Sequence, residues 1–376
     1  MQPKPPRRGR ATALVVALSL LCGGIGLEIG GALFGASNQT RTAATTNTVD
    51  TAPLPTVGST TPAGGGAASA LSADEIAAKV DPAIVDITTK LDGGAAAGTG
   101  MVLTSSGLVL TNNHVIADAT QIRVQVNGSG PTYAATVLGY DVTEDVALLQ
   151  VNGAPALTTI DVGNSSLVKV DDHVVALGNA LGRGGTPAVA EGTVTALDRS
   201  IEAGDATGNG APTQTLSGLI EFNAQLLPGD SGGPLVNASG QVVGMDAAAS
   251  QGTRRRAAND SFAIPINTAL AIAHQIQSGQ STAKVHVGPR ALLGVQVSQS
   301  GGASVAGVQS GSPADKAGIT AGDTIVSVDS TTISSVSDLP AALDHHRPGD
   351  SVTIGWLDGN GQHHTASVQL IEGPPA

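Results

Sequence analysis

Hydrophobic and polar positions alternate in short segments through most of the chain after residue 84. The segments AIVDITTKL, QIRVQVNG, YAATVLGYD and EGTVTALDR are typical, and Gly, Asn and Asp residues separate one segment from the next. Alternation with a period of two predicts β-strands that each present one apolar face. Short strands at even spacing are typical of a β-sandwich or a β-barrel. The pattern therefore predicts a mainly β protein.

Two stretches depart from this alternation and predict helices. Ser72 and Glu75 form a capping-box signature at the start of a short helix, which a following Asp-Pro pair ends. The segment NTALAIAHQIQSG has apolar residues at helical spacing and stops at Gly279. We expect this second helix to close a first domain over residues 72–280, and a strand-rich second domain to occupy residues 287–372.

The N-terminal part of the chain shows neither pattern. Residues 1–10 are basic, residues 11–35 are mostly apolar, and residues 36–71 are rich in Thr, Ala, Pro and Gly. Basic residues before an apolar run direct a chain out of the cytoplasm and leave the basic end inside. The segment that follows buries too little apolar surface to fold. We expect a transmembrane anchor or a cleaved signal peptide, then a disordered linker, and hence an extracytoplasmic protein that is either membrane-anchored or secreted.

Composition and charge narrow the class of protein. The chain has 376 residues, of which 41% are hydrophobic and 2% aromatic, and this fits two β-rich domains better than long amphipathic helices. The net charge of −12 repels the phosphates of nucleic acid, so no nucleic-acid partner is expected. Cys22 is the one cysteine, which excludes a disulfide framework and a thiolate metal cluster. Neither a metal nor a cofactor is expected.

The stretch PGDSGGPL places Ser231 in a cluster of glycines. A serine hydroxyl is a weak nucleophile until a base removes its proton, and that base is most often a histidine held by a third group. His114 follows an apolar strand in LVLTNNHVI, and Asp145 directly precedes the apolar run VALL, which draws its carboxylate toward the interior. The order His114, Asp145, Ser231 is that of the chymotrypsin-type catalytic triad.

The letters GDSGG also match the GxSxG signature of α/β-hydrolases. In that fold the acid and the histidine follow the serine, and a helix follows the turn. Here both partners precede Ser231, and a strand, a turn and a second strand follow it, which excludes the α/β-hydrolase interpretation. The glycines fit an oxyanion hole in the turn of Gly229, Asp230 and Ser231, where the amides of Gly229 and Ser231 would point at one spot.

These motifs, with FAIPI before the second helix and GSPADKAGITAGDTIVSVDS near the C-terminus, resemble the HtrA/DegP family of trypsin-like serine proteases with a C-terminal PDZ domain, in particular its secreted PepA-like branch. The resemblance covers about four-fifths of the chain, from Leu71 to the end. It implies a chymotrypsin-like double β-barrel of six strands each, with the active site between the barrels. It also implies a serine endopeptidase that hydrolyses unfolded or damaged proteins through an acyl-enzyme.

Two positions depart from the family pattern. Most members have Asn before the catalytic serine, whereas this chain has Asp230, as trypsin does. Because no activation site that would supply a new N-terminus is visible, we expect another partner for this carboxylate, or solvent. Gln225 stands at the base of the substrate pocket in place of a small residue, and Leu226 and Leu227 follow it. We expect a pocket for small or medium apolar side chains, which Gln225 narrows or makes more polar.

The segment RALLGVQV resembles the carboxylate-binding loop of a PDZ domain. Leu292, Leu293, Gly294 and Val295 occupy its motif positions, which implies a site for the C-termini of peptides. The segment SVSDLPAALDHH, with Ser337 as the N-cap, would form the helix along this groove. Leu339 and Leu343, four residues apart in that helix, could face the bound peptide or the core of the domain, and we expect the core.

Two questions stay open at this point. Members of the family form trimers through aromatic residues near the start of the protease domain, but residues 71–85 contain no Phe, Trp or Tyr; a homo-oligomer is left open. The chain could also be a non-catalytic chaperone or peptide-binding scaffold that keeps the fold without the chemistry. The presence of His114, Asp145 and Ser231 together favours the enzyme.

Overall fold

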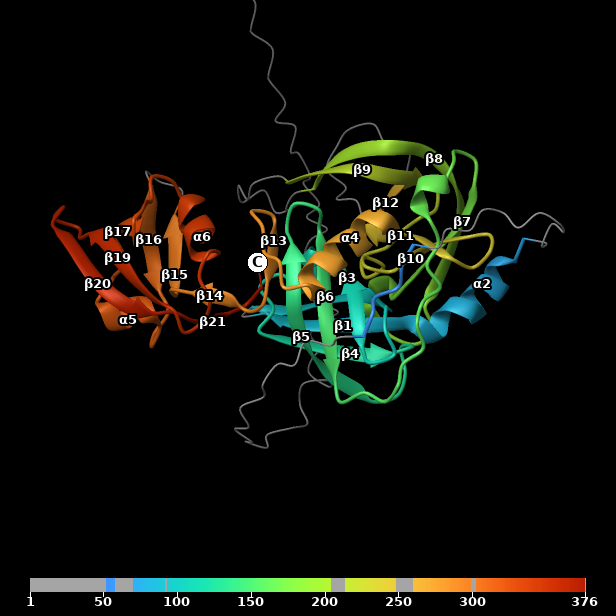
Figure 1. Ribbon diagram of the computed structural model, residues 1–376, viewed down its shortest axis with the longest axis horizontal. Helices are drawn as coiled ribbons and strands as arrows, with labels where there is room; N and C mark the ends of the chain where they lie inside the picture. Colours follow the sequence, from blue (N-terminus) through green and yellow to red (C-terminus); the bar gives the residue numbers. More distant parts are fainter. Residues whose placement is uncertain are drawn as a thin grey trace, which may run out of the picture.

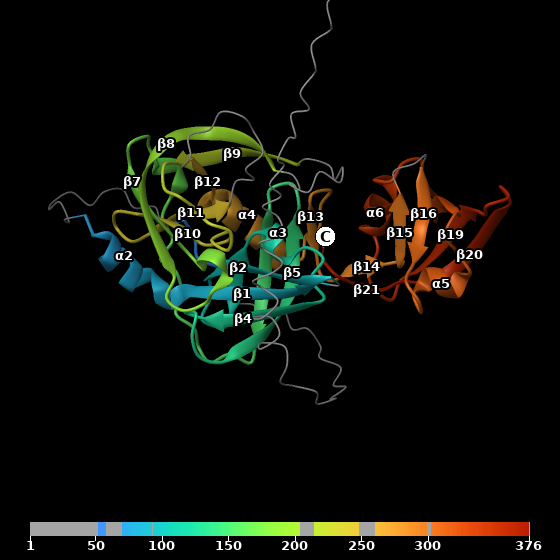
Figure 2. The same cartoon turned by 180° about the vertical axis from the view of Figure 1, so that it is seen from behind.

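The computed structural model describes residues 52–57, 70–91, 93–203, 214–247, 260–298 and 302–375 of the protein. Two β-barrels and a smaller β-rich unit follow one another along the chain (Figures 1 and 2). The basic segment, the apolar segment 11–35 and most of the expected linker lie outside the described residues. Within the ranges given above, no helix is long and apolar enough to cross a membrane.

The first barrel is a ring of six antiparallel strands in the order β5-β4-β1-β2-β3-β6, which closes because β5 also pairs with β6. Helix α2 (Ala73–Val80) precedes it. The hydroxyl of Ser72 accepts a hydrogen bond from the N–H of Glu75, whose carboxylate accepts one from the N–H of Ser72, so the predicted capping box is confirmed. The elements that follow are the 3-10 turn η1 (Asp81–Ala83), β1 (Ile84–Leu91), β2 (Gly94–Val102), β3 (Leu108–Thr111), α3 (Asn113–Ile116), β4 (Gln121–Val126), β5 (Thr132–Asp141) and β6 (Val146–Asn152).

The second barrel is a closed ring of six strands in the order β10-β11-β12-β9-β8-β7. Helix α4 (Ile266–Gln277) follows it. Ser278 is its C-cap, and Gly279 comes next with a left-handed φ of 76°, as the sequence predicts. The elements before this helix are η2 (Ser165–Leu167), β7 (His173–Gly178), η3 (Ala180–Gly182), β8 (Ala188–Ala203), β9 (Gln214–Phe222), β10 (Pro234–Asn237), β11 (Val242–Ala247) and β12 (Ser261–Pro265).

Many strands of the two barrels are buried on both faces. On β1, Val85 and Ile87 point into the interior of the first barrel, whereas Ile84 joins a second apolar cluster. This second cluster also contains Phe262 of the second barrel and Leu270 of α4, so it forms the layer that joins the barrels. Because this layer packs against both barrels, it positions their loops next to each other. These loops carry the candidate site.

Strand β13 (Val285–Val287) lies at the expected boundary between the two units. It pairs with β5 of the first barrel, with Val287 opposite Gly139, and Val285 is buried in the layer between the barrels. The first strand of the second unit, β14, begins at Arg290. The start of that unit at residue 287 stays a prediction, and the pairing of β13 with β5 favours a later start. A strand of three residues is too short for its pattern of polarity to reveal which sheet it joins.

The C-terminal unit has its own apolar core and a sheet in the order β15-β16-β17-β19-β20. Leu339 and Leu343 are buried in that core, as expected. Ser337 precedes the helix but makes no capping hydrogen bond with its side chain. The elements of this unit are β14 (Arg290–Leu292), β15 (Val295–Ser298), β16 (Ala303–Val308), α5 (Pro313–Ala317), β17 (Thr324–Val328), β18 (Thr331–Thr332), α6 (Asp338–Leu343), β19 (Ser351–Leu357), β20 (His363–Gln369) and β21 (Ile371–Gly373).

Candidate active site

His114 and Asp145 come from two segments of the first barrel and meet at its edge. The single turn of helix α3 after Thr111 carries His114, and Asp145 is the last residue before β6. The Nδ1 atom of His114 lies 2.7 Å from Oδ2 of Asp145, and the main-chain N–H of His114 donates to Oδ1 at 2.9 Å. Both oxygens of one carboxylate therefore hold the same residue, which orients the imidazole and favours the tautomer with its proton on Nδ1.

The turn before β6 holds Asp145 in place. Its backbone has a left-handed φ of 54°, a conformation that Asp tolerates better than most residues. Its carbonyl oxygen accepts a hydrogen bond from the amide group of Asn112 at 2.9 Å. Oδ1 of Asp141 accepts from the N–H groups of Thr143 and Glu144 and so closes the turn. Asp145 is 6% exposed, which confirms that its carboxylate faces inward.

The pKa of His114 lies above its ordinary value. Partial desolvation of the ring acts alone to lower this pKa, but the negative charge of Asp145 and the hydrogen bond to it raise the pKa by more. The neutral imidazole is the form that can take a proton. A reaction that uses His114 as the base is therefore lost as the pH falls through this raised pKa.

The turn that carries Ser231 packs too closely against both barrels to accept side chains at two of its glycines. Gly229 and Gly232 have left-handed φ angles of 102° and 85°. A Cβ atom on Gly229 would collide with the carbonyl oxygen of Asn179, and one on Gly232 with that of Thr99. The serine itself is 4% exposed. These glycines serve the close approach of main chain to main chain.

Thr99 of β2 docks this turn onto the first barrel. Its N–H donates to the carbonyl oxygen of Ser231 at 2.9 Å, and its hydroxyl donates to that of Gly229 at 2.7 Å. Its own carbonyl oxygen accepts from the hydroxyl of Thr111 at 2.7 Å. Since Thr111 ends β3, directly before the segment that carries His114, these bonds hold Ser231 beside that segment.

The amides of the predicted oxyanion turn differ in what they bind. The N–H of Asp230 donates to the carbonyl oxygen of Leu227 at 3.0 Å, so it is engaged within the turn. The carbonyl oxygen of Pro228 accepts from the N–H of Leu181 at 2.6 Å. Because the N–H and C=O of a trans peptide point in opposite directions, the N–H of Gly229 points away from Leu181. Asp230 is thus unavailable as a donor, whereas Gly229 stays a candidate.

The carboxylate of Asp230 is buried. The residue is 4% exposed, and its Oδ2 atom accepts a hydrogen bond from the N–H of Leu227 at 2.8 Å. Burial raises the pKa of Asp230 to about 6, and the hydrogen bond from Leu227 lowers it by less. The alternative that solvent surrounds this carboxylate is therefore wrong. Its partner is a main-chain amide of its own turn.

The three residues of the predicted substrate pocket directly precede the turn. Gln225 is exposed, and Leu226 and Leu227 are half-buried. The N–H of Leu226 donates to the hydroxyl of Ser261 at 3.2 Å, and that hydroxyl donates to the carbonyl oxygen of Ala224 at 2.6 Å. The hydroxyl of Ser261 thus holds the main chain of this segment, and the side chain of Gln225 is left at the surface.

The predicted peptide-binding loop lies in the C-terminal unit, at the edge of its sheet. Leu293 is buried, Leu292 and Val295 are half-buried, and Gly294 has a left-handed φ of 84°. The carbonyl oxygen of Leu293 accepts from the N–H of Ala314 at 2.9 Å, which ties the loop to α5. Among the described strands, β15 pairs with β16 alone, so its other edge can add a strand.

Sequence reasoning missed three residues that shape the site: Thr99, Asn179 and Asp246. The N–H of Asn179 donates to the hydroxyl of Thr99, and its side-chain oxygen accepts from the N–H of Gly184, both at 2.8 Å. Nothing in the sequence marks Thr99, because Asn179 and Gly229 lie 80 and 130 residues further along the chain. Asp246 is completely buried in β11. Its signal was an acid within the otherwise apolar run VVGMDAA.

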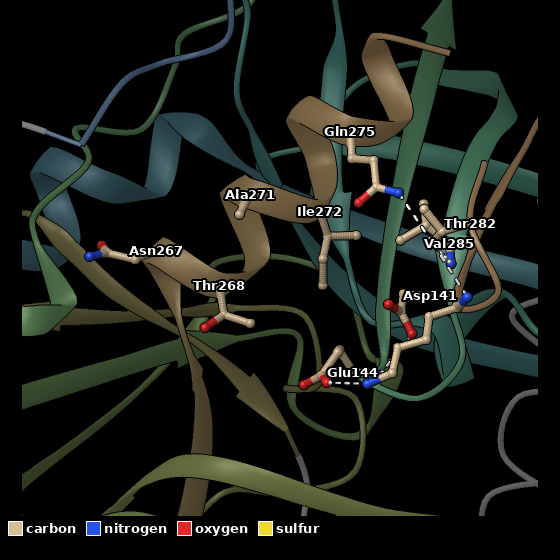
Figure 3. Close-up of a pocket in the computed structure, with 10 residues that line it drawn as sticks. Asp141, Glu144, Asn267, Thr268, Ala271, Ile272, Gln275, Thr282 and Val285 are labelled. Carbon is tan, nitrogen blue, oxygen red and sulfur yellow. Dashed lines mark hydrogen bonds and ion pairs between the residues drawn. The ribbon is translucent and has the colours of Figure 1, made fainter. Parts of the chain in front are cut away.

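A surface cleft of about 520 Å³ lies next to the turn that precedes Asp145 (Figure 3). The ammonium group of Lys284 lies 3.5 Å from the carboxylate of Glu144 across it. His114 and Ser231 are not among its lining residues, so it is separate from the candidate active site. In the part of the chain that the structure describes, no group of three or more His, Cys, Asp or Glu side chains could hold a metal ion.

The sequence matches two known domain families. Residues 98–245 match the trypsin-like peptidase domain, and residues 291–370 match the PDZ domain. The first range contains His114, Asp145 and Ser231, and the second contains the predicted peptide-binding loop. The chain is therefore a trypsin-like peptidase domain followed by a PDZ domain.

Several known serine proteases are similar in sequence to this chain. Serine protease PepD of Mycobacterium tuberculosis is 35% identical over 317 residues, which are 80% of this chain and 66% of the relative. Periplasmic pH-dependent serine endoprotease DegQ of Escherichia coli is 34% identical over 288 residues, 73% of this chain and 59% of the relative. The solved structure of HtrA-type protease AlgW with a tripeptide is 28% identical, with a TM-score of 0.48, and the match covers 81% of this chain and 99% of that chain. The chain belongs to the HtrA/DegP family of serine proteases, and it spans from about half to two thirds (51–66%) of the length of the curated relatives that it matches.

Proposed function

We propose that the chain is an extracytoplasmic serine endopeptidase that hydrolyses peptide bonds of unfolded or damaged proteins. The observation that carries the proposal is the pair of bonds, 2.7 and 2.9 Å long, by which Asp145 holds His114 beside the docked turn of Ser231. The names of the relatives support the location and the class, since several are periplasmic serine endoproteases.

In this proposal Ser231 is the nucleophile and His114 the general base. His114 takes the hydroxyl proton on Nε2 while Oγ of Ser231 attacks the carbonyl carbon of the substrate, and it then gives that proton to the leaving amine. Water, activated by the same base, releases the acyl group from the serine. Asp145 keeps the tautomer and stabilises the imidazolium that forms. The amides of Gly229 and Ser231 stabilise the oxyanion, and loss of one such donor costs about 10²–10³ in kcat.

The remaining site residues receive binding roles. Gln225, Leu226 and Leu227 form a pocket for a small or medium apolar side chain of the substrate. The PDZ loop binds the C-termini of peptides by adding them to the free edge of β15, through Leu292, Leu293, Gly294 and Val295.

The N-terminal segment and the oligomeric state complete the proposal. Residues 11–35 either anchor the protein in the cell membrane or are removed on export. The N-terminal sequence of the mature protein in membrane and soluble fractions distinguishes these outcomes. A homo-oligomer is retained as an open part of the proposal, and sedimentation of the mature protein measures it.

A fluorophosphonate probe, which reacts with activated serines, tests the enzyme against the non-catalytic chaperone. We expect wild type and the control Ser239→Ala, which changes an exposed serine of the β10–β11 turn, to be labelled and to degrade an unfolded protein. Ser231→Ala should do neither. Failure of wild type to react, or equal reaction of Ser231→Ala, would favour the chaperone. Sequencing of the released peptides tests the pocket, because Arg or Lys before the cleaved bond would contradict it.

A further inference from the structure

Asp230 and Asp246 are two acidic side chains buried beneath the Ser231 turn. Their exposed fractions are 4% and 0%. Among the described residues, the two carboxylate oxygens of Asp246 have no hydrogen-bond partner. Of the two oxygens of Asp230, only Oδ2 has one. Burial of polar atoms without partners costs free energy, and burial of a charge costs more. The two buried carboxylates therefore do not stabilise the folded protein.

Main-chain hydrogen bonds couple β11 to the catalytic turn. The N–H of Gly232 donates to the carbonyl oxygen of Asp246, and the N–H of Asp246 donates to that of Gly233, both at 2.8 Å. The N–H of Gly233 also donates to the carbonyl oxygen of Asp230 at 2.9 Å. These three bonds join both acids to the residues that flank Ser231. Displacement of either acid therefore shifts the main chain at the serine.

The described strands packed around the pair carry no basic side chain close to it. Helix α4, which packs against β11, carries His274, whose Nδ1 atom lies 2.7 Å from the carbonyl oxygen of Leu270. Arg183, which follows the η3 turn, is exposed. The strands β2, β10 and β12 contain no titratable side chain, and β11 contributes Asp246 alone. On β7, which approaches Asp230 at Gly178, the titratable residue is His173 at the opposite end, where it lies 3.6 Å from Glu191. Burial first, and then the negative charge of Asp230, raise the pKa of Asp246 well above its ordinary value.

We propose that Asp230 and Asp246 hold one shared proton beneath the Ser231 turn, and that this proton keeps the turn docked. With the proton, one carboxyl is neutral and can donate its O–H to an unpartnered oxygen of the other. Without it, two buried negative charges repel, and outward movement of Asp230 relieves the repulsion but withdraws Ser231 from Thr99. Asp230 and Asp246 are positioning residues, and the inference rests on the proposed function because catalysis is the property that they control.

The pH profile of kcat/KM tests the shared proton. We compare wild type with Asp246→Asn, which keeps the shape of the side chain but cannot ionise, and with Asp171→Asn, which changes an exposed acid. As the pH rises through the raised pKa of Asp246, at which the pair loses its last proton, we expect kcat/KM of wild type and of the control to fall by about tenfold or more, and that of Asp246→Asn by less than about twofold. All three should share the decline at low pH that His114 sets. An equal alkaline decline in Asp246→Asn would overturn the proposal.

A second measurement needs no catalysis and so separates failure of this proposal from failure of the proposed function. Hydrogen exchange at the amides of Gly232 and Gly233 is followed in Ser231→Ala at pH 6 and pH 9, after correction for the intrinsic effect of pH. We expect protection to be lost at pH 9 in Ser231→Ala and kept when Asp246→Asn is added. Asp230→Asn removes the same repulsion and replaces Asp246→Asn if that variant does not fold. Protection at pH 9 in Ser231→Ala equal to that at pH 6 would overturn the shared proton.

Discussion

At the scale of single residues, the candidate site depends on which atoms carry protons. Asp145 accepts from the main-chain N–H of His114 and holds its Nδ1 atom with the other oxygen. The proton of the neutral ring is thus kept on Nδ1, and Nε2 is left able to accept the proton of the serine. An amide in place of this carboxylate would present a donor to Nδ1 and move the ring proton to Nε2.

Asp145→Asn is therefore expected to lower kcat by about 10⁴. The low-pH limb of the profile should also move to lower pH, because the charge that raises the pKa of His114 is gone. Steady-state kinetics across pH measure both effects. The control is Glu144→Gln, whose half-buried acid pairs with exposed Lys284 and should change kcat by less than about twofold. A loss below tenfold in Asp145→Asn would contradict the role of the acid.

Asp86 is another buried acid, 5% exposed, and neither of its carboxylate oxygens has a partner among the described residues. Burial raises its pKa to about 7 from an ordinary value of 3.8. At pH values between 3.8 and about 7, the carboxyl group of Asp86 is protonated in the folded protein and ionised in the unfolded chain. The free energy of unfolding therefore falls as the pH rises from about 4 to about 7, and the loss persists above that range.

Asp86→Asn should remove this loss. We expect the variant to be more stable than wild type by about 2 kcal/mol at pH 8 and not at pH 3, since one pKa unit corresponds to about 1.4 kcal/mol and an unpartnered buried amide offsets part of the gain. Urea denaturation at several pH values measures the difference, with exposed Asp171→Asn as the control. A stability gain that is the same at pH 3 and pH 8 would show that the charge of Asp86 is not its cause.

The sequence could predict some of these acids and not others. Asp145 lies between a turn and an apolar strand, where the alternation of the strand indicates which way its side chain points. Asp86 and Asp246 lie inside strands, and an acid in a half-buried strand is expected to face solvent. Both faces of β1 and β11 are buried, because one faces a barrel interior and the other the layer between the barrels. Alternation cannot reveal a second buried face.

At the scale of elements, the sequence predicts the ends of a helix correctly where residues at that end stabilise it. Ser72 and Glu75 start α2, and Gly279 follows the end of α4, as predicted. The contacts that dock the Ser231 turn instead join residues that lie far apart in the sequence. Thr99 binds Gly229 from 130 residues away, and β13 has a sheet to join only once β5 lies beside it. Such features follow from tertiary packing and have no local pattern in the sequence.

At the scale of the whole molecule, the protease unit and the PDZ unit have separate apolar cores. The core of the PDZ unit contains residues from Ala291 to Leu370 only. Strand β13 belongs to the first unit, and the N–H of Gly288 just after it donates to the carbonyl oxygen of Leu138 at 2.8 Å. The chain can therefore be divided between Gly288 and Arg290 without breaking either core.

Two truncated chains test this division. A chain that ends at Gly288 should fold, react with the fluorophosphonate probe within about twofold of the full-length rate, and lose binding to peptide C-termini. A chain that ends at Gly279 also lacks the pairing of β13 with β5 and the burial of Val285, which is 3% exposed. We expect this shorter chain to be less stable by about 2 kcal/mol or more, as loss of one buried valine and its strand implies.

The shorter chain should also react more slowly with the probe. Val285 pairs with Asp141, whose carboxylate closes the turn that leads to Asp145. Loss of β13 therefore frees the end of β5 next to Asp145, the proposed catalytic acid. Thermal unfolding and the rate of labelling, measured for both chains, separate the effect of the PDZ unit from that of the strand. Equal stability and equal labelling of the two chains would place β13 outside the protease unit and return the boundary to the position that the sequence predicts.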